Sequence, residues 1–154
     1  MRPGRREGTS SRAPSSLRTM PDPELVRAPL RSAPLGSRSN DFVLREHRDA
    51  GDGLPRHGIP LHRHRSEDEA WYILEGALRF RYGDREFEAS DGTGVLLPRG
   101  TPHTFWNPGP AAVRYLMIVG PKTEGLLEAL HGPEPIDAAK LRDVYESFDA
   151  ELLE

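Results

Sequence analysis

The stretch HRHRSEDEAWYILEG, residues 62–76, decides how the fold of this chain is interpreted. It opens with two histidines one residue apart, His62 and His64, and Glu69 follows after four further residues. Alternate residues of a β-strand face the same side, so the two imidazoles point the same way and can reach one ion. Glu69 keeps this parity on the next strand if residues 65–68 form the connecting loop. The stretch therefore predicts two strands that share a set of metal ligands.

A second stretch, GTGVLLPRGTPHTFWN, covers residues 92–107 and contains a third histidine, His103. Three imidazole nitrogens and one carboxylate oxygen form a donor set that suits first-row divalent metals. His103 is remote in sequence, and closure of a sheet must bring it to the other three residues. A His-x-His pair alone indicates metal binding only weakly, but the combined spacing predicts a site made of His62, His64, Glu69 and His103.

Residues 40–120 consist of short strand-like runs separated by glycine, proline and aspartate. In residues 78–82, apolar side chains alternate with arginines, as in a strand with one solvated face. The pair Gly83-Asp84 between two such runs indicates a tight hairpin. Many short strands with regular turns predict an all-β sandwich or barrel. The expected strands are Asp41–Arg48, Trp71–Leu74, Ala77–Tyr82, Arg85–Ala89, Gly94–Leu97, His103–Trp106 and Ala112–Val119.

We expect a β-barrel over residues 39–121. The two ends of the chain differ from it in composition. Residues 1–38 are rich in arginine, serine, proline and glycine, without helical or strand periodicity, so we expect a mostly disordered tail. The first 20 residues are poor in acids, which leaves two alternatives open. They are an organelle targeting peptide, or an upstream-extended start with Met20 as the natural first residue.

Residues 122–154 are expected to form a C-terminal helical extension. Thr123 and Asp137 could each cap a helix, and Gly132 would end the first one. Helical spacing predicts that the second helix packs on the barrel, or on a partner subunit, through an apolar face made of Leu141, Val144, Tyr145, Phe148 and Leu152.

Composition narrows the class of protein. The chain has 154 residues, no cysteine and a formal net charge of -3. This length suits one domain with a substantial core. The charge gives no electrostatic reason to expect a nucleic-acid partner, and the absence of cysteine excludes disulfides and thiolate ligands. No apolar run approaches the roughly 20 residues that a membrane span needs. We therefore expect a cytoplasmic protein that binds neither nucleic acid nor membrane.

The two quoted stretches resemble the paired motifs of the cupin superfamily, in particular its small single-domain members similar to quercetin dioxygenase. The second stretch matches at each defining position, and the first departs only at its opening glycine, where Arg56 stands. The resemblance covers about residues 40–120. It implies a double-stranded β-helix, that is, a jelly-roll cupin barrel, with C-terminal α-helices. It also implies one divalent transition metal (Fe, Mn, Ni, Cu, Co or Zn) near the wide mouth.

The resemblance implies three alternative functions. Four protein ligands leave one or two metal positions open for water, a substrate oxygen or dioxygen. The first expectation is a dioxygenase acting on a small, oxygen-bearing, largely apolar substrate, with Glu69 as ligand and catalytic base. The second is a redox-neutral cyclase or isomerase, similar to polyketide cyclases, in which the metal is a Lewis acid. The third is a cupin that binds a ligand without turnover.

Strand parity predicts the residues of the pocket, and the resemblance implies the roles of several other residues. The substrate pocket is expected to contain Trp71, Ile73, Phe80, Phe105, Tyr115 and Met117, with Tyr82 as a further candidate. We expect turns at Gly76, Gly92 and Gly100, a turn or hydrogen-bonding role for Asn107, and surface positions for His47, His57 and His131, with His57 nearest the mouth. A homodimer is expected, paired through the strand at residues 41–48 or the terminal helix.

Overall fold

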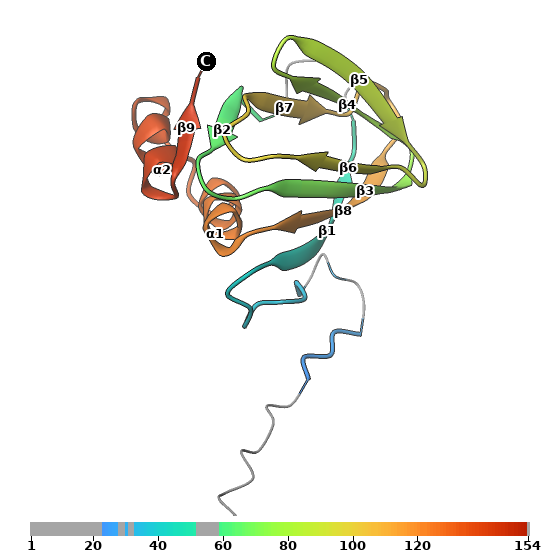
Figure 1. Ribbon diagram of the computed structural model, residues 1–154, viewed down its shortest axis with the longest axis horizontal. Coiled ribbons are helices and arrows are strands. Elements are labelled where there is room, and N and C mark those ends of the chain that lie inside the picture. Colours follow the sequence, from blue (N-terminus) through green and yellow to red (C-terminus); the bar gives the residue numbers. More distant parts are fainter. Residues whose placement is uncertain (1–22, 28–29, 31–32, 52–58, 154) are drawn as a thin grey trace, which may run out of the picture.

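The computed structural model describes residues 23–27, 30, 33–51 and 59–153 (Figure 1). The predicted tail lies mostly outside these residues, and Arg56 and His57 lie outside them as well. The elements are β1 (Val43–Asp49), β2 (His62–His64), β3 (Glu69–Glu75), β4 (Ala77–Tyr82), β5 (Arg85–Ser90), β6 (Gly94–Leu97), β7 (His103–Trp106), β8 (Val113–Val119), α1 (Pro121–Leu130), a 3-10 helix (Ala138–Lys140), α2 (Leu141–Ser147) and β9 (Ala150–Leu152).

The strands form two antiparallel sheets. One has the order β1-β8-β3-β6 and the other the order β5-β4-β7-β2-β9. The two sheets face each other as a jelly roll, and α1, α2 and β9 lie together at one end (Figure 1). The predicted all-β double-stranded β-helix with C-terminal helices is confirmed. The expected strands are all present, and their bounds differ by at most two residues at an end.

The core lies between the sheets because each strand alternates buried and more exposed residues. In β8, Val113, Tyr115, Met117 and Val119 are buried and the residues between them are not. Trp71 of β3 makes edge-to-face contacts with Phe80 of β4 and Phe105 of β7, with ring centroids 5.3 and 5.2 Å apart. The two-residue hairpin at Gly83-Asp84 joins β4 to β5 as predicted, and Tyr82 pairs with Arg85.

The start of α1 differs from the prediction. Thr123 is not the cap but the third residue of the helix, which begins at Pro121. The capping role belongs to Glu67 in the β2–β3 loop, whose carboxylate accepts hydrogen bonds from the backbone N–H groups of Lys122 (3.0 Å) and Thr123 (2.8 Å). A Cβ at Gly120 would collide with this carboxylate. Local sequence could not reveal a cap that comes from a distant loop.

The last helix is also shorter than predicted. Asp137 caps a 3-10 turn, as its Oδ1 accepts from the N–H of Ala139 (2.9 Å), and α2 follows directly. However, α2 ends at Ser147 and the chain turns at Asp149, whose φ is 60°. Leu152 therefore lies in strand β9 and not on the helix. The helical spacing predicted a longer helix because Leu152 packs with Tyr145 in the same small core, although it belongs to a strand.

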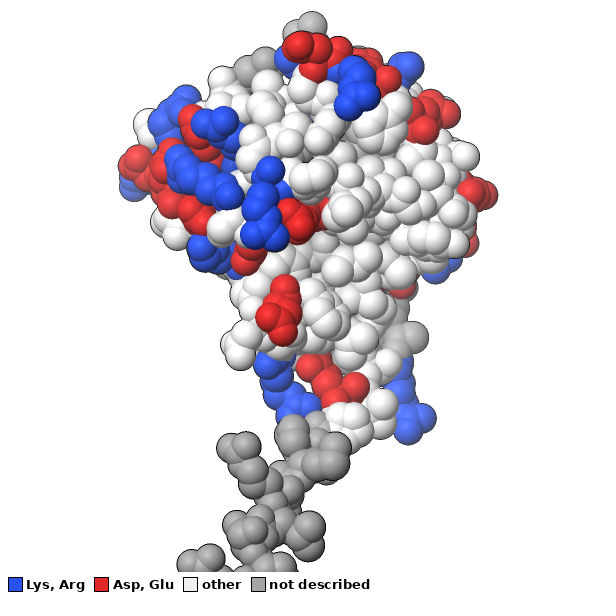
Figure 2. All heavy atoms as spheres, in the orientation of Figure 1, with Lys and Arg blue, Asp and Glu red and all other residues white. Residues whose placement is uncertain are grey.

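Charged side chains are unevenly distributed over the surface. In Figure 2 they gather over the C-terminal segment, whereas the outer face of the β1-β8-β3-β6 sheet is mostly uncharged. Tyr72 and Leu96 on this face are 44% and 63% exposed. No helix within the described ranges is long and apolar enough to cross a membrane. The expected homodimer stays a prediction.

Candidate metal centre

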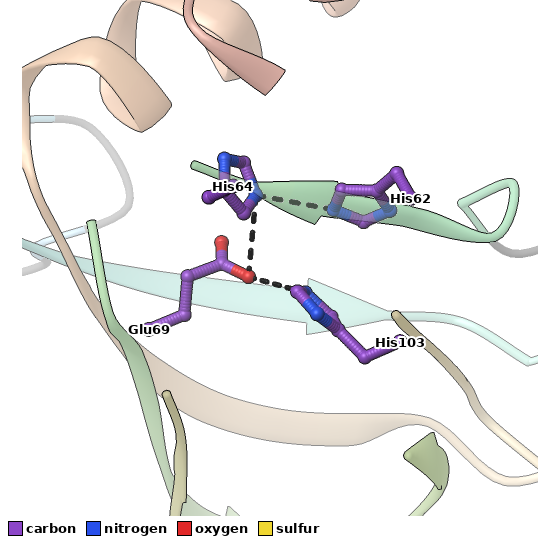
Figure 3. A group of neighbouring side chains, drawn as sticks. All are labelled: His62, His64, Glu69 and His103. Carbon is purple, nitrogen blue, oxygen red and sulfur yellow. Dashed lines mark hydrogen bonds and ion pairs between the residues drawn. The ribbon is translucent and has the colours of Figure 1, made fainter. Parts of the chain in front are cut away.

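All four predicted ligand residues meet at one point between the two sheets (Figure 3). His62 and His64 come from β2, His103 from the start of the neighbouring strand β7, and Glu69 from the start of β3 in the opposite sheet. Their ligand atoms lie within 4.8 Å of one another, and all four residues are buried. Closure of the jelly roll, which the spacing could not show, produces this arrangement.

The imidazoles turn their Nε2 atoms toward the centre because each Nδ1 has a partner on the outside. His62 Nδ1 lies 2.8 Å from the carbonyl oxygen of Pro60, and His103 Nδ1 lies 2.9 Å from that of Thr101. A carbonyl oxygen only accepts, so each of these Nδ1 atoms carries the proton and donates it. In the neutral rings the lone pair is then on Nε2, the orientation that metal-binding histidines adopt.

His64 completes this pattern through a different partner. Its Nδ1 lies 3.2 Å from the hydroxyl oxygen of Thr123, which is buried in the first turn of α1. The helix that Glu67 caps therefore also supplies an outer partner for one of the ligands. The sequence pattern indicated only a capping role for Thr123, because this contact joins residues that are far apart in the chain.

The inner atoms form a compact, electron-rich set. His62 Nε2 lies 3.1 Å from His64 Nε2, and Glu69 Oε2 lies 2.6 Å from His103 Nε2 and 3.4 Å from His64 Nε2. Lone pairs on neighbouring nitrogens repel one another unless a proton or a cation lies between them. Nitrogen and carboxylate oxygen donors in this number fit a single divalent transition metal.

The charge states of two residues of the centre, His62 and Glu69, suit metal binding. Burial and the charge of His103 together lower the pKa of His62 to about 4, although the charge of Glu69 acts in the opposite direction. Burial alone would raise the pKa of Glu69, but hydrogen bonds from His103 and His64 hold that pKa well below its usual range. For His103, burial acts to lower the pKa and the bond to Glu69 outweighs it, so the pKa is raised. Glu69 is therefore ionised and His62 neutral at pH 7, the forms in which they bind metals.

The two loops that carry Glu69 and His103 are joined next to the centre. Asp68 precedes Glu69, and its Oδ1 accepts from both the backbone N–H (2.9 Å) and the Nε–H (2.8 Å) of Arg99. Hydrogen bonds from the Arg99 side chain and backbone lower the pKa of Asp68 to about 2. Gly100, with a φ of 80°, makes the predicted turn, and its N–H donates to the carbonyl of His64 (2.7 Å). These contacts fix the separation of ligands from different strands.

The other predicted turn residues have the expected roles. Gly76 and Gly92 have φ angles of 86° and 77°. Asn107 accepts from the N–H of Gly109 (3.0 Å) and donates from Nδ2 to the carbonyl of Ala111 (2.7 Å). Asn107 thus organises the turn before β8 and lies apart from the ligands.

Strand β9 is the main pairing partner of β2, the strand that carries His62 and His64. Its three residues pair with β2, whereas β7 pairs with β2 only at His62 and His103. Arg63 of β2 also forms an ion pair with Glu151 of β9, with 2.6 Å between Nη2 and Oε2. Sequence analysis missed β9 because an alternation over three residues is too short to distinguish from the end of a helix.

A cavity of about 320 Å³ lies beside the centre, between the barrel and the C-terminal segment. Of the predicted pocket residues, Phe105, Tyr115 and Met117 line it. Trp71, Ile73 and Phe80 do not, because they are packed in the core between the sheets, with exposed fractions of 1% or less. Its other lining residues are His47, Asp49, Ile59, Pro60, Leu127, Leu130, His131, Leu141 and Tyr145.

Two cavity residues differ from their predicted roles. His47, expected at the surface, stacks on Tyr115 with ring centroids 5.4 Å apart, and burial together with the charges of Arg45 and His131 lowers its pKa to about 4. Tyr145, expected only on a helix face, is fully buried and its ring lies 5.4 Å from that of His62. Burial and the charge of Glu69 raise the pKa of Tyr145 to about 12. His131 is exposed as predicted.

Comparison with known proteins finds one matching domain family. Residues 54–119 match the family model of the cupin domain. The protein MJ1618 of Methanocaldococcus jannaschii is 34% identical over 56 residues, 36% of this chain and 45% of that protein. This chain therefore spans less than half of the length of that curated relative.

Solved structures with a similar fold include two bacterial proteins. A protein from Thermus thermophilus is 25% identical to this chain. The match covers 54% of this chain and 75% of that protein, with a TM-score of 0.46. A sugar phosphate isomerase of the cupin superfamily from Silicibacter pomeroyi is 24% identical to this chain. The match covers 52% of this chain and 50% of that protein, with a TM-score of 0.46. The cupin-domain match contains all four ligand residues and ends before α1.

Proposed function

We propose that this protein is a metal-dependent dioxygenase that acts on a small, oxygen-bearing, largely apolar organic molecule. The observation that carries the proposal is the convergence of three Nε2 atoms and one carboxylate oxygen at a buried point, with each Nδ1 engaged outside. One divalent transition metal would be held there by His62, His64, Glu69 and His103. When bound, such a metal supplies Lewis acidity and, if redox-active, activation of dioxygen.

The protein side of the reaction involves binding, orientation and proton transfer. Glu69 is ionised, so its carboxylate can accept a proton from a substrate hydroxyl next to it. The cavity beside the centre is lined by aromatic and aliphatic residues together with His47, Asp49 and His131, and it would orient a flat molecule. The outer partners of the histidines keep the Nε2 atoms aimed at the centre during the reaction.

The test combines metal analysis with oxygen consumption. The full chain is purified, its metal content is measured, and oxygen uptake is followed with β-dicarbonyl and polyphenol compounds. We expect one divalent transition metal per chain and turnover that requires both metal and oxygen. Unchanged product formation under strict anaerobiosis would contradict the dioxygenase and favour a redox-neutral cyclase or isomerase. Failure to retain any divalent metal after reconstitution would contradict both.

A further inference from the structure

The loop between the ligand strands β2 and β3, residues 65–68, makes polar contacts with three other segments. Arg65 contacts the turn before β9, Glu67 contacts the first turn of α1, and Asp68 contacts the loop between β6 and β7. The loop begins directly after His64 and ends directly before the first residue of β3, which is also a ligand. Because the loop joins two ligand residues, its contacts help to fix where both of them lie.

Glu67 makes the contact that leads back to a ligand. Its two carboxylate oxygens accept different backbone N–H groups, Oε1 that of Lys122 and Oε2 that of Thr123. The hydroxyl of the same Thr123 lies 3.2 Å from Nδ1 of His64, and both residues are buried. The loop thus holds the backbone of a helix residue whose side chain contacts the ligand.

We propose that Glu67 is a positioning residue of the metal centre, which acts on His64 through Thr123. The carboxylate fixes the first turn of α1, and that turn fixes the hydroxyl against the outer nitrogen of the imidazole. The inner Nε2 of His64 then stays aimed at the other ligands. The inference rests on the proposed function only in that a divalent metal binds at this centre, and it does not depend on the reaction.

The residue before α1 shows that space is kept for this carboxylate. Gly120 has a φ of -77° and a ψ of 169°, an extended backbone that any residue can adopt. A Cβ at this position would collide with all three atoms of the Glu67 carboxyl group. Glycine therefore serves the carboxylate here and not the backbone. The dipole of the ten-residue helix also favours a negative charge at this end.

The test measures Co²⁺ binding to the full chain by visible absorption, which reports both affinity and coordination geometry. Glu67→Ala removes both acceptors and should weaken binding by roughly 3–10-fold, less than loss of the direct partner of the imidazole. Gly120→Ala should have a similar effect, because it displaces the carboxylate without changing its chemistry. In a Thr123→Val background, which lacks the hydroxyl, Glu67→Ala should weaken binding little further.

Asp137→Ala is the matched control. Asp137 is exposed, and its carboxylate accepts from the N–H of Ala139 to cap the 3-10 turn before α2. Asp137→Ala and Glu67→Ala each remove a cap, so both should unfold at a lower temperature than the wild type. Only Glu67→Ala should also change the affinity for Co²⁺ and the absorption spectrum, which a purely structural role would leave unchanged.

Three results would overturn the inference. They are an unchanged Co²⁺ affinity in Glu67→Ala, equal losses in Glu67→Ala and Asp137→Ala, and a full further loss from Glu67→Ala in the Thr123→Val background. If oxygen uptake is absent but the variants show the expected order of affinities, the inference stands and the proposed dioxygenase fails.

The nitrogen chemical shifts of the His64 ring, measured without metal, give a second readout. They should change in Glu67→Ala and stay as in the wild type in Asp137→Ala. If the protein bound no metal, the dioxygenase would fail, whereas the inference would stand only with this pattern of shifts.

Discussion

The barrel and the C-terminal segment contribute to the same centre in different ways. The barrel, residues 59–119, supplies all four ligand residues, and the cupin-domain match covers this part of the chain. The C-terminal segment, residues 121–153, supplies no ligand, but it supports the centre. Strand β9 pairs with β2, which carries His62 and His64, Thr123 contacts Nδ1 of His64, and Tyr145 borders the cavity. The identity of the donor residues is therefore encoded in the barrel, whereas their placement also depends on the C-terminal segment.

The largest expected effect comes from removing a ligand from the barrel. His103→Ala deletes one of the three imidazoles, so metal affinity should fall by more than the roughly 100-fold that loss of an outer partner can cost. The matched control is His131→Ala, since His131 is exposed and outside the centre. Metal titration of both variants checks this prediction. Stoichiometric, tight metal binding by His103→Ala would refute the assigned centre.

The next effect tests whether the C-terminal segment controls the barrel's ligands. Thr123→Val keeps the shape of the side chain but removes the hydroxyl next to His64 Nδ1. We expect metal affinity to fall by about 10–100-fold. Thr123→Ser, which restores the hydroxyl, should recover most of the affinity. If valine and serine variants bind metal equally well, the helix contact plays no part in positioning His64.

Stability should depend on the C-terminal core as well as on the barrel. Leu152→Ala removes a leucine that is 7% exposed and packs with Leu126 and Tyr145. Such a truncation costs about 2–5 kcal/mol of unfolding free energy. Leu96→Ala, at a site that is 63% exposed, should change it by no more than about 0.5 kcal/mol. Denaturant titration measures both, and equal values would mean that β9 is not part of the cooperative fold.

The smallest expected effect is a pH dependence that originates at His47. Its pKa in the folded protein is about 4, below the ordinary 6.5, so the folded state favours the neutral ring. The unfolded chain then binds the proton more readily, and stability should fall as pH decreases from about 6.5 toward 4. His47→Phe should show a shallower decline over this window in thermal unfolding. An identical decline in His47→Phe and the wild type would assign the loss to other groups.

The barrel was largely predictable because its signals are local and repeated. Alternation in residues 78–82, the Gly83-Asp84 turn and the spacing of glycines and proline all point to short antiparallel strands. The four ligands follow from the same parity, since alternate positions of a strand share a face.

The C-terminal segment was predictable only in part because its structure depends on long-range partners. The cap of α1 comes from Glu67, more than fifty positions earlier in the chain. Strand β9 forms because it pairs with the edge of β2. Its three residues are too few for their sequence pattern to predict this pairing. Trp71 and Ile73, which were predicted to line the pocket, lie in the core instead, for a related reason. Parity shows which face a side chain is on, but not whether neighbours fill the space in front of it.

Residue types and periods of a few residues were enough to specify the donor residues of the centre, the antiparallel barrel and the turns between its strands. Only the tertiary structure decided which nitrogen of each histidine faces the centre, that a distant helix and strand hold His64 in place, and that His47 and Tyr145 border the cavity. These features arise from contacts between segments far apart in the chain, and packing of the whole molecule is what brings those segments together.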